Sequence, residues 1–452
     1  MARERPGALV AVLALALAAT ATASAMAHSS NPTSLPNALS VAGDAESTAL
    51  YCTGLSGAGG GAAGVVSFLN TQPHARTLSV TVVNNTGQRV TRRVSVAGSS
   101  TSQVSPSSWL GGHSYGVEAV VNGGGVVAEE VGANASALAP CVAGGVTSWY
   151  ASGFDTRVGS SAALSFFNPT ATPAVIDVTT FTATGYAAPA PFQGFAVGPH
   201  DQVEINLGAQ IVNTDNVGVG VSVVRGAVAI LGVQRSGAMT SFTTGSTSAT
   251  TRAWFPQVTT AAAARAEVRL TNPSALPADV TVEVSLGSFH VAPRTVTVAP
   301  QSTGVVTITP NPAIPAAGFA SLRVSASQPV VAALATGSAA GFSLSAPTGP
   351  RREFLVSDFS GRGFATATLT NVSARPLAVS LVALATSGSR AVRAHATVLG
   401  GATESLRVLF ARLGPLHGRS FFVSARRSAL VVTLTLPGRP SGVSVVAPLD
   451  GR

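Results

Sequence analysis

Phe68-Leu69-Asn70 closes a short apolar run, and the pattern returns as Phe166-Phe167-Asn168-Pro169, Leu270-Thr271-Asn272-Pro273 and Leu369-Thr370-Asn371. Successive asparagines in these four stretches are 98, 104 and 99 residues apart. Solenoid and propeller repeats recur every 20 to 50 residues or so, roughly half this period or less. The spacing therefore predicts one domain repeated four times.

Two further landmarks keep register with each asparagine. An aromatic residue precedes it by 17 to 19 positions, and a turn glycine follows it by 15 to 17 positions, after alternating runs such as Leu78–Val82. Alternation closed by a turn residue is typical of a β-hairpin. The aromatic residues are Tyr51, Trp149, Trp254 and Phe354, and the glycines are Gly87, Gly185, Gly287 and Gly388.

Valine-rich runs predict two more hairpins in each repeat. The second is expected to begin near Val96, Val197, Val298 and Val398, and the third near Val126, Val228, Val330 and Val431. Helical periodicity is nearly absent. We therefore predict an all-β chain, a tandem array of about four immunoglobulin-like or fibronectin-like β-sandwich domains after an N-terminal signal or anchor segment.

The N-terminus has the pattern of an export signal. Arg3 and Arg5 precede an apolar run, and Ala25-Met26-Ala27 is a small-residue cleavage site. Because apolar and small residues continue from Ala8 to Ala27, an uncleaved anchor of about 20 residues is the alternative. The alanine, serine and threonine of the second half favour a cleaved signal peptide over residues 1–27.

The remaining length predicts the domain boundaries. A polar linker is expected over residues 28–48, where serine, asparagine, proline and alanine are frequent. Each unit after it has roughly 100 residues, the size of a sandwich domain that closes its own core. The units are residues 49–141, 142–249, 250–350 and 351–452.

The chain has two cysteines, Cys52 and Cys141, which bracket the first unit. Disulfides persist in oxidising compartments, and an exported chain enters one. We therefore predict that the two cysteines form a structural disulfide. Reactive thiols or metal ligation are the alternatives.

Charge distinguishes the last unit from the others. Every basic residue other than histidine is arginine, and residues 351–452 hold thirteen of them against four acids. This excess of nine equals the formal net charge of +9 for the whole chain. A clustered subset could dock on an anionic cell-wall polymer or membrane surface, the alternative being that the arginines only keep the chain soluble. The candidate residues are Arg390, Arg393, Arg407, Arg426 and Arg427.

Catalytic, cofactor and metal motifs are not found in the sequence. The seven histidines stand singly and form no H-E-x-x-H pair, so no metal site is expected. The adjacent acids Glu129 and Glu130 would point to opposite faces of a strand and could not flank one glycosidic bond. No aromatic stripe accompanies the arginines, so nucleic-acid binding is not expected.

The aromatic openings Trp149-Tyr150 and Trp254-Phe255, the Asn-Pro turns and the run Gly125-Val126-Val127-Ala128 carry a resemblance. The chain resembles an uncharacterised family of actinobacterial exported proteins, assigned to a domain of unknown function, with an N-terminal signal or anchor and repeated all-β units. The last unit departs from it, since Val372 follows Asn371 where the second and third units have proline. The resemblance implies an extracellular or envelope location and this fold, and no activity.

Two classes of function follow as expectations. The first is a non-catalytic exported cell-envelope protein, a structural or binding scaffold that presents its loops to wall material or to another exported protein. The second is an enzyme or accessory subunit acting on envelope polysaccharide. It would need two carboxylates, brought together from different units, about 5 to 10 Å apart. Isolated acids in similar repeats favour the first class.

Overall fold

The computed structural model is all-β, as the sequence predicts. In the described part of the chain the regular elements are β-strands and the short 3-10 helices η1, η3 and η4, and no α-helix is present there. The structure describes residues 47–56, 63–133, 137–237, 239–259, 265–286, 289–309, 314, 319–338, 341–350, 352–356, 366–383, 392–405, 421–427, 430–435, 442–443 and 447–448. The N-terminal segment 1–27 lies outside these ranges. None of the described residues belongs to a helix with the length and apolarity to cross a membrane.

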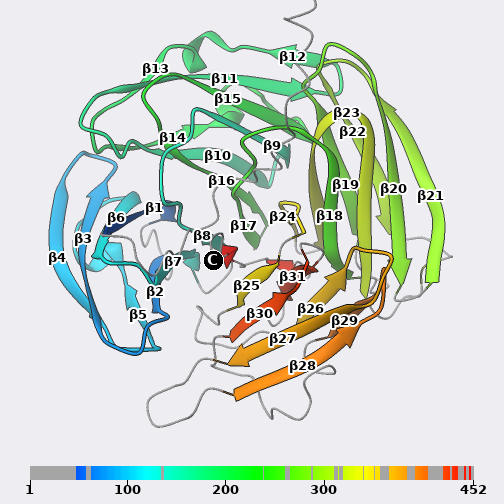
Figure 1. Cartoon of the computed structure of the whole chain (residues 1–452). Helices are drawn as coiled ribbons and strands as arrows, with labels where there is room; N and C mark the ends of the chain where they lie inside the picture. Colours follow the sequence, from blue (N-terminus) through cyan, green and yellow to red (C-terminus); the bar gives the residue numbers. More distant parts are fainter. Residues whose placement is uncertain are drawn as a thin grey trace, which may run out of the picture. The chain divides into compact units, whose positions relative to one another are not determined.

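The strands fall into four sets along the chain, coloured from blue to red in Figure 1. The first set is β1 (Ser47–Ser56), β2 (Val65–Asn70), β3 (Arg76–Asn84), β4 (Arg89–Val96), β5 (Thr101–Val104), η1 (Pro106–Ser108), β6 (Ser114–Asn122), β7 (Val126–Val131) and β8 (Leu138–Pro140). The second set is β9 (Ser148–Phe154), β10 (Ser160–Phe167), β11 (Ala174–Thr182), β12 (Gly185–Ala187), η3 (Ala190–Phe192), β13 (Phe195–Val197), β14 (Gln202–Asn206), η4 (Leu207–Ala209), β15 (Val217–Arg225), β16 (Ala229–Ser236) and β17 (Met239–Thr243).

The third set is β18 (Thr250–Thr259), β19 (Arg265–Asn272), β20 (Ala278–Leu286), β21 (Phe289–Val298), β22 (Ser302–Thr309), β23 (Phe319–Ser338) and β24 (Gly341–Ser345). The fourth set is β25 (Glu353–Val356), β26 (Thr366–Asn371), β27 (Leu377–Ala383), β28 (Val392–Val398), β29 (Thr403–Ser405), β30 (Phe421–Ala425), β31 (Leu430–Thr435), β32 (Gly442–Val443) and β33 (Ala447–Pro448).

One pairing scheme recurs in all four sets. The first set forms two sheets, with the orders β1-β6-β3-β4 and β5-β2-β7-β8. The second set forms two sheets with the orders β9-β15-β11-β12 and β14-β10-β16-β17. The fourth set forms two sheets with the orders β25-β30-β27-β28 and β29-β26-β31-β32. In the third set β23 serves both sheets. Its first half pairs with β18 and β20, and from Val331 onward it pairs with β19 and β24.

This order departs from that of an immunoglobulin domain. In immunoglobulins the second strand lies between the first and fifth, and the sixth lies between the third and seventh. Here β2 lies between β5 and β7, and β6 lies between β1 and β3. The first and seventh strands have therefore exchanged sheets.

Of the three hairpins predicted in each repeat, the first and the third are confirmed. The third pairs β7 with β8, β16 with β17, the second half of β23 with β24, and β31 with β32. The first consists of four equivalent pairs. β3 pairs with β4, β11 with β12, β20 with β21 and β27 with β28. Gly87 in the turn between β3 and β4, and Gly185 at the start of β12, have φ values of 78° and 128°, which glycine adopts readily.

The second hairpin prediction was wrong. Val96, Val197, Val298 and Val398 end strands, and the next strand belongs to the other sheet. Alternating strands around a short turn look alike in sequence whether or not they pair. Burial distinguishes the two cases at the second predicted hairpin. The four valines that end the strands are at most 1% exposed and fill the space between the two sheets: Val96, Val197, Val298 and Val398.

The four anchor asparagines, Asn70, Asn168, Asn272 and Asn371, are fully buried at the ends of equivalent strands. Each side-chain amide donates to the carbonyl four residues ahead and to the carbonyl of the valine that ends the neighbouring sheet's strand. Each side-chain oxygen accepts from the N–H two residues ahead, which forms an Asx turn. The expected strand end and turn are confirmed at all four positions.

A second turn meets each anchor asparagine. The N–H groups of Ser99, His200, Gln301 and Gly401 donate to the anchor turns at 2.8, 3.2, 2.9 and 2.9 Å. All four residues have positive φ, between 49° and 71°. This backbone direction aims the N–H at the anchor turn, so that the buried asparagine ties the two sheets of its set together.

One sheet of each of the first three sets has a strand buried on both faces. β7 is buried along its whole length and β10 along its last six residues, whereas β4 at a sheet edge is mostly exposed. All described residues belong to one compact unit, Leu35–Arg452. Within it β1 contacts β10 and β16 of the second set, and β9 contacts β19 and β23 of the third. Neighbouring sets therefore share buried faces.

Candidate functional site

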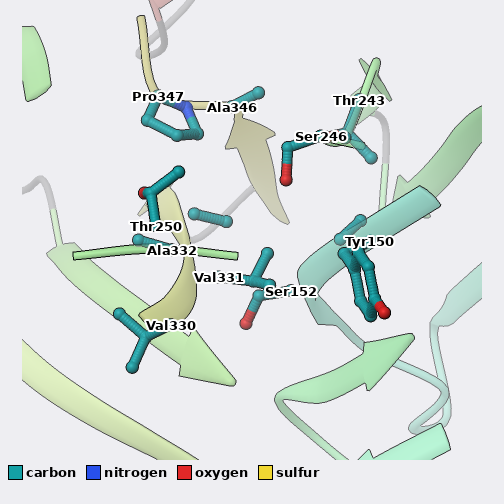
Figure 2. A pocket seen from close by; sticks show the side chains of 13 residues that line it. Tyr150, Ser152, Thr243, Ser246, Thr250, Val330, Val331, Ala332, Ala346 and Pro347 are labelled. Carbon is teal, nitrogen blue, oxygen red and sulfur yellow. The ribbon is translucent and has the colours of Figure 1, made fainter. Parts of the chain in front are cut away.

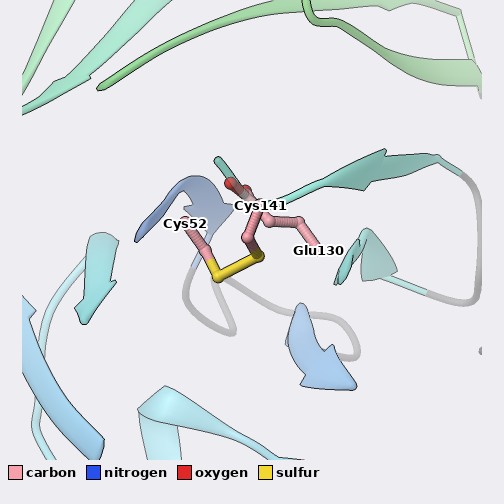
Figure 3. Close-up of side chains that lie close together, drawn as sticks. All are labelled: Cys52, Glu130 and Cys141. Carbon is pink, nitrogen blue, oxygen red and sulfur yellow. A yellow bond between two sulfur atoms is a disulfide. The ribbon is translucent and has the colours of Figure 1, made fainter. Parts of the chain in front are cut away.

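Cys52, Cys141 and Glu130 form a buried cluster in the first set. Cys52 lies on β1, Glu130 on β7, and Cys141 follows β8. The two cysteines form a disulfide with a Cα–Cα separation of 4.6 Å. Their sulfurs and the carboxylate of Glu130 lie within 4.8 Å of one another, and all three residues are at most 2% exposed (Figure 3). The predicted pair is thus joined, beside an acid that the sequence analysis assigned to no site.

A bulge in β1 receives the carboxylate of Glu130. The register between β1 and β6 shifts between Cys52 and Leu55, so the N–H groups of Thr53 and Gly54 leave the ladder. They donate to Oε1 and Oε2 of Glu130 at 2.5 and 2.6 Å. The carboxylate of Glu130 therefore accepts the hydrogen bonds that these two N–H groups do not donate within the sheet.

Burial shapes the acidity of Glu130. Its desolvation disfavours the charged form and raises the pKa from 4.5 to about 7, although the two N–H donors act in the opposite direction. The carboxyl thus exchanges a proton near neutrality. In the disulfide form no thiol beside it is free to react, so the cluster holds the fold together in this state.

The same bulge touches the second set. The hydroxyl groups of Thr53 and Ser165 lie 3.0 Å apart, and Ser165 also donates to the carbonyl of Thr53. Gln202 donates to Ser165 and accepts from Ser114, both at 3.0 Å. This network joins β1 and β6 to β10 and β14. Its polar groups are buried and bonded to one another.

A small cavity lies where the second and third sets meet (Figure 2). Its volume is about 20 Å³, and its wall includes Tyr150, Ser152, Ser246, Thr250 and Val331. One water needs roughly 10 to 15 Å³, whereas a ligand site has roughly 300 to 1,000 Å³. The cavity can therefore hold about one water, which the hydroxyl groups could bind, but no substrate of ordinary size.

Charged side chains link the same two sets. Arg269 is buried, donates to the carbonyl of Gly153 at 2.8 Å and lies 4.7 Å from the ring centre of Phe342. Burial lowers its pKa, while the nearby Glu267, 3.4 Å away, favours the charged form. Asp155 and Arg157 form an ion pair, with 2.5 Å between a carboxylate oxygen and a guanidinium nitrogen. These charges are paired within the fold.

The structure places part of the predicted arginine site. Arg393 is exposed on β28, and Arg426 and Arg427 are exposed directly after β30. Arg393 pairs in register with Val382, which in turn pairs with Phe422 of β30, three residues before the end of that strand. Arg393 is therefore near the opposite end of β30 from Arg426 and Arg427. Arg390 and Arg407 lie outside the described residues.

Glu130 is the residue that sequence reasoning missed. Alternation along β7 directs Glu129 and Glu130 to opposite faces, as expected, but both faces are buried. The sequence did contain a signal, namely two adjacent acids inside the apolar run Val126–Val131. A strand with one solvated face would have polar residues at every second position, whereas the other residues of this run are apolar at both odd and even positions. Which backbone groups would receive the carboxylate depends on the bulge in β1, which the sequence does not reveal.

Comparison with known proteins identifies a family. A model described as a family of unknown function (DUF5719) matches residues 126–409. Among curated proteins, none matches the chain. Three solved structures show low similarity. A tetra-tandem repeat from the extending region of a large adhesion protein is 13% identical and covers 88% of this chain and 99% of its own, with a TM-score of 0.13.

The other two structures cover less of this chain. A GH78 family rhamnosidase of Bacillus sp. GL1 is 7% identical, with 74% of this chain and 56% of its own covered and a TM-score of 0.16. Red sea bream transglutaminase is 15% identical, with 43% and 30% covered and a TM-score of 0.12. Because all three TM-scores lie below 0.5, these likenesses carry no argument.

Proposed function

The chain belongs to the family of unknown function DUF5719, and we propose that it is a non-catalytic exported protein of the cell envelope, a structural or binding scaffold. One observation carries this proposal: the anchor asparagines, Glu130 and Arg269 are buried and are hydrogen-bonded within the fold. The anchor asparagines hold backbone carbonyls, Glu130 holds a bulge, and Arg269 is bonded across two strand sets. Groups engaged in this way maintain shape.

The proposed architecture is a tandem array of four β-sandwich units, residues 49–141, 142–249, 250–350 and 351–452. The recurrence of one strand order in all four sets supports it. Shared buried faces support a stiff array, since separating two sets would expose apolar strands. The exchanged first and seventh strands make each unit a relative of the immunoglobulin sandwich rather than a copy of it.

Export is proposed from residues 1–27, read as a signal peptide or anchor, with residues 28–48 as a linker. The Cys52–Cys141 disulfide supports it, because disulfides persist in oxidising compartments. The location is then extracellular or in the cell envelope. An actinobacterial source, implied by the resemblance, belongs to the same proposal.

The proposed partner is an anionic cell-wall polymer or membrane surface, with another exported protein as the alternative. Support comes from the excess of nine positive charges in residues 351–452 and from the exposure of Arg393, Arg426 and Arg427. Guanidinium groups bind phosphate and carboxylate in bidentate geometry. Exposed charges act over about 8 Å at physiological salt, so binding should weaken as salt is added.

The test is sedimentation of the purified full chain with isolated envelopes. We expect the triple variant R393A/R426A/R427A to bind several-fold more weakly, and added salt to reduce binding by the unaltered chain. The variant R89A/R93A is the matched control, because both arginines are exposed on the edge strand β4. Equal binding by both variants, or binding insensitive to salt, would indicate that these arginines only keep the chain soluble.

A further inference from the structure

The cluster of Cys52, Glu130 and Cys141 has the residue types of a metal site. Two sulfurs and a carboxylate oxygen from three separate segments converge within 4.8 Å. No other group of three histidines, cysteines or acids in the described part of the chain meets this spacing. While the disulfide is intact, each sulfur is bonded to the other and cannot act as a thiolate.

We propose that reduction of the Cys52–Cys141 disulfide converts this cluster into a binding site for a divalent thiophilic metal ion, of which Zn²⁺ is the type. A dithiol reductant supplies two electrons and two protons, so the S–S bond breaks, two thiols form and the reductant becomes a disulfide. The metal ion then forms two metal–sulfur bonds. The two thiol protons leave to solvent, and the carboxylate of Glu130 is the third protein ligand.

The donor set determines the class of metal. Two thiolates with one carboxylate suit a borderline-soft ion, whereas Ca²⁺ and Mg²⁺ prefer oxygen alone. Zinc accepts sulfur and carboxylate oxygen in one tetrahedral site, and three protein ligands leave its fourth position open. The ion would also neutralise two of the three negative charges that the ligands bring into a buried place.

The fold holds the ligands in place. The backbones of Cys52 and Cys141 lie 4.6 Å apart at Cα, and Glu130 is oriented by the N–H groups of Thr53 and Gly54. Donors that orient a ligating carboxylate support metal affinity. Gly54 contributes through its size, since a Cβ there would lie 3.0 Å from Oε2 of Glu130 and collide with Leu231.

The test uses the full chain, reduced with a phosphine so that no added thiol competes for metal, and Co²⁺ as the spectroscopic probe. We expect one Co²⁺ per reduced chain with sulfur-to-cobalt charge-transfer absorption, displaced by Zn²⁺. The disulfide form should show no such absorption. The variant E130Q should bind at least tenfold more weakly, which is about 1.4 kcal/mol, while E118Q, altered on β6, should bind as the unaltered chain does.

Stability gives a second readout. Zn²⁺ should raise the unfolding temperature of the reduced chain and of reduced E118Q but leave that of reduced E130Q nearly unchanged. Absence of charge-transfer absorption in the reduced chain would overturn the proposal. So would equal Co²⁺ affinity in E130Q, which would mean that the two thiols bind metal without the folded cluster.

Discussion

Asn168 uses both ends of its side-chain amide in the folded chain. Its NH₂ group donates to the carbonyls of Thr172 and Val197 at 2.8 and 3.0 Å, and its oxygen accepts from the N–H and hydroxyl of Thr170 at 2.9 and 2.8 Å. Aspartate has nearly the same shape but would set a carboxylate oxygen against two carbonyl oxygens. Asparagine is therefore required for its donor as well as for its turn.

Replacing Asn168 tests this role. We expect N168A to lower the free energy of unfolding by about 2 to 4 kcal/mol, because several buried backbone groups lose their partners. Urea unfolding measures the change, and N122A at the exposed end of β6 is the control, with an expected effect within about 0.5 kcal/mol. Equal effects of the two substitutions would show that the anchor asparagine contributes no special stability.

Gln301 is a second residue whose backbone is constrained by the anchor turn. Its φ is 49°, a conformation that costs a side-chain-bearing residue about 1 kcal/mol or more, while the equivalent position in the fourth set is Gly401. We expect Q301G to raise the free energy of unfolding by roughly 0.5 to 1 kcal/mol, the relief of strain exceeding the added freedom of the unfolded chain. Destabilisation in urea would contradict this.

Glu130 predicts a pH dependence in the disulfide form. Its pKa is about 7 in the folded chain and 4.5 ordinarily, so the folded chain binds more protons between these values. Stability should be highest below about pH 4.5, fall as pH rises to about 7 and then level off, with an upper limit of about 3 kcal/mol. In E130Q this part of the slope should be missing when unfolding is compared at pH 5 and pH 8. An unchanged slope would assign the pH dependence to other groups.

At the scale of elements, alternation and spacing predicted the strands and two of the three hairpins in each set, but not the crossing from one sheet to the other. The four anchor turns and the first and third hairpins of each set follow from local patterns, namely an Asx turn and alternating runs closed by a short turn. The choice between pairing and crossing to the other sheet is made by burial of Val96 and its three equivalents, which depends on strands distant in sequence. The bulge in β1 has the same origin, since Glu130 lies 77 residues from Thr53.

The candidate site was predictable to a different extent. Two lone cysteines in a chain with the pattern of an export signal were enough to predict the disulfide, and the structure contains it. The arginine positions were predicted from composition alone, and composition does not fix a face. Arg393 and Arg426 illustrate this, because the register sets them toward opposite ends of β30.

At the scale of the molecule, the strand sets are joined by specific close contacts. Gly218 of β15 lies against Thr271 of β19, and a Cβ at Gly218 would come within 2.9 Å of the Cβ of Thr271 and closer still to its hydroxyl. That hydroxyl donates to Ser152 at 2.8 Å across the same boundary. The second and third sets therefore approach as closely as glycine allows.

Filling this contact should loosen the boundary. We expect G218A to cost about 1 to 3 kcal/mol through overpacking and to increase protease cleavage between the second and third sets. G111A is the control, because nothing lies within 4 Å of a Cβ there. If both variants resist protease as the unaltered chain does, the two sets are not held by this contact.

Our central proposal is that the chain binds envelope material and does not transform it. The most direct measurement incubates the full chain with isolated envelope polysaccharide and records, in the same sample, bound protein and newly released reducing ends. The account predicts saturable, salt-sensitive binding with no release above the buffer control. Release of reducing ends that grows with time and protein concentration would contradict it and identify an enzyme acting on envelope polysaccharide.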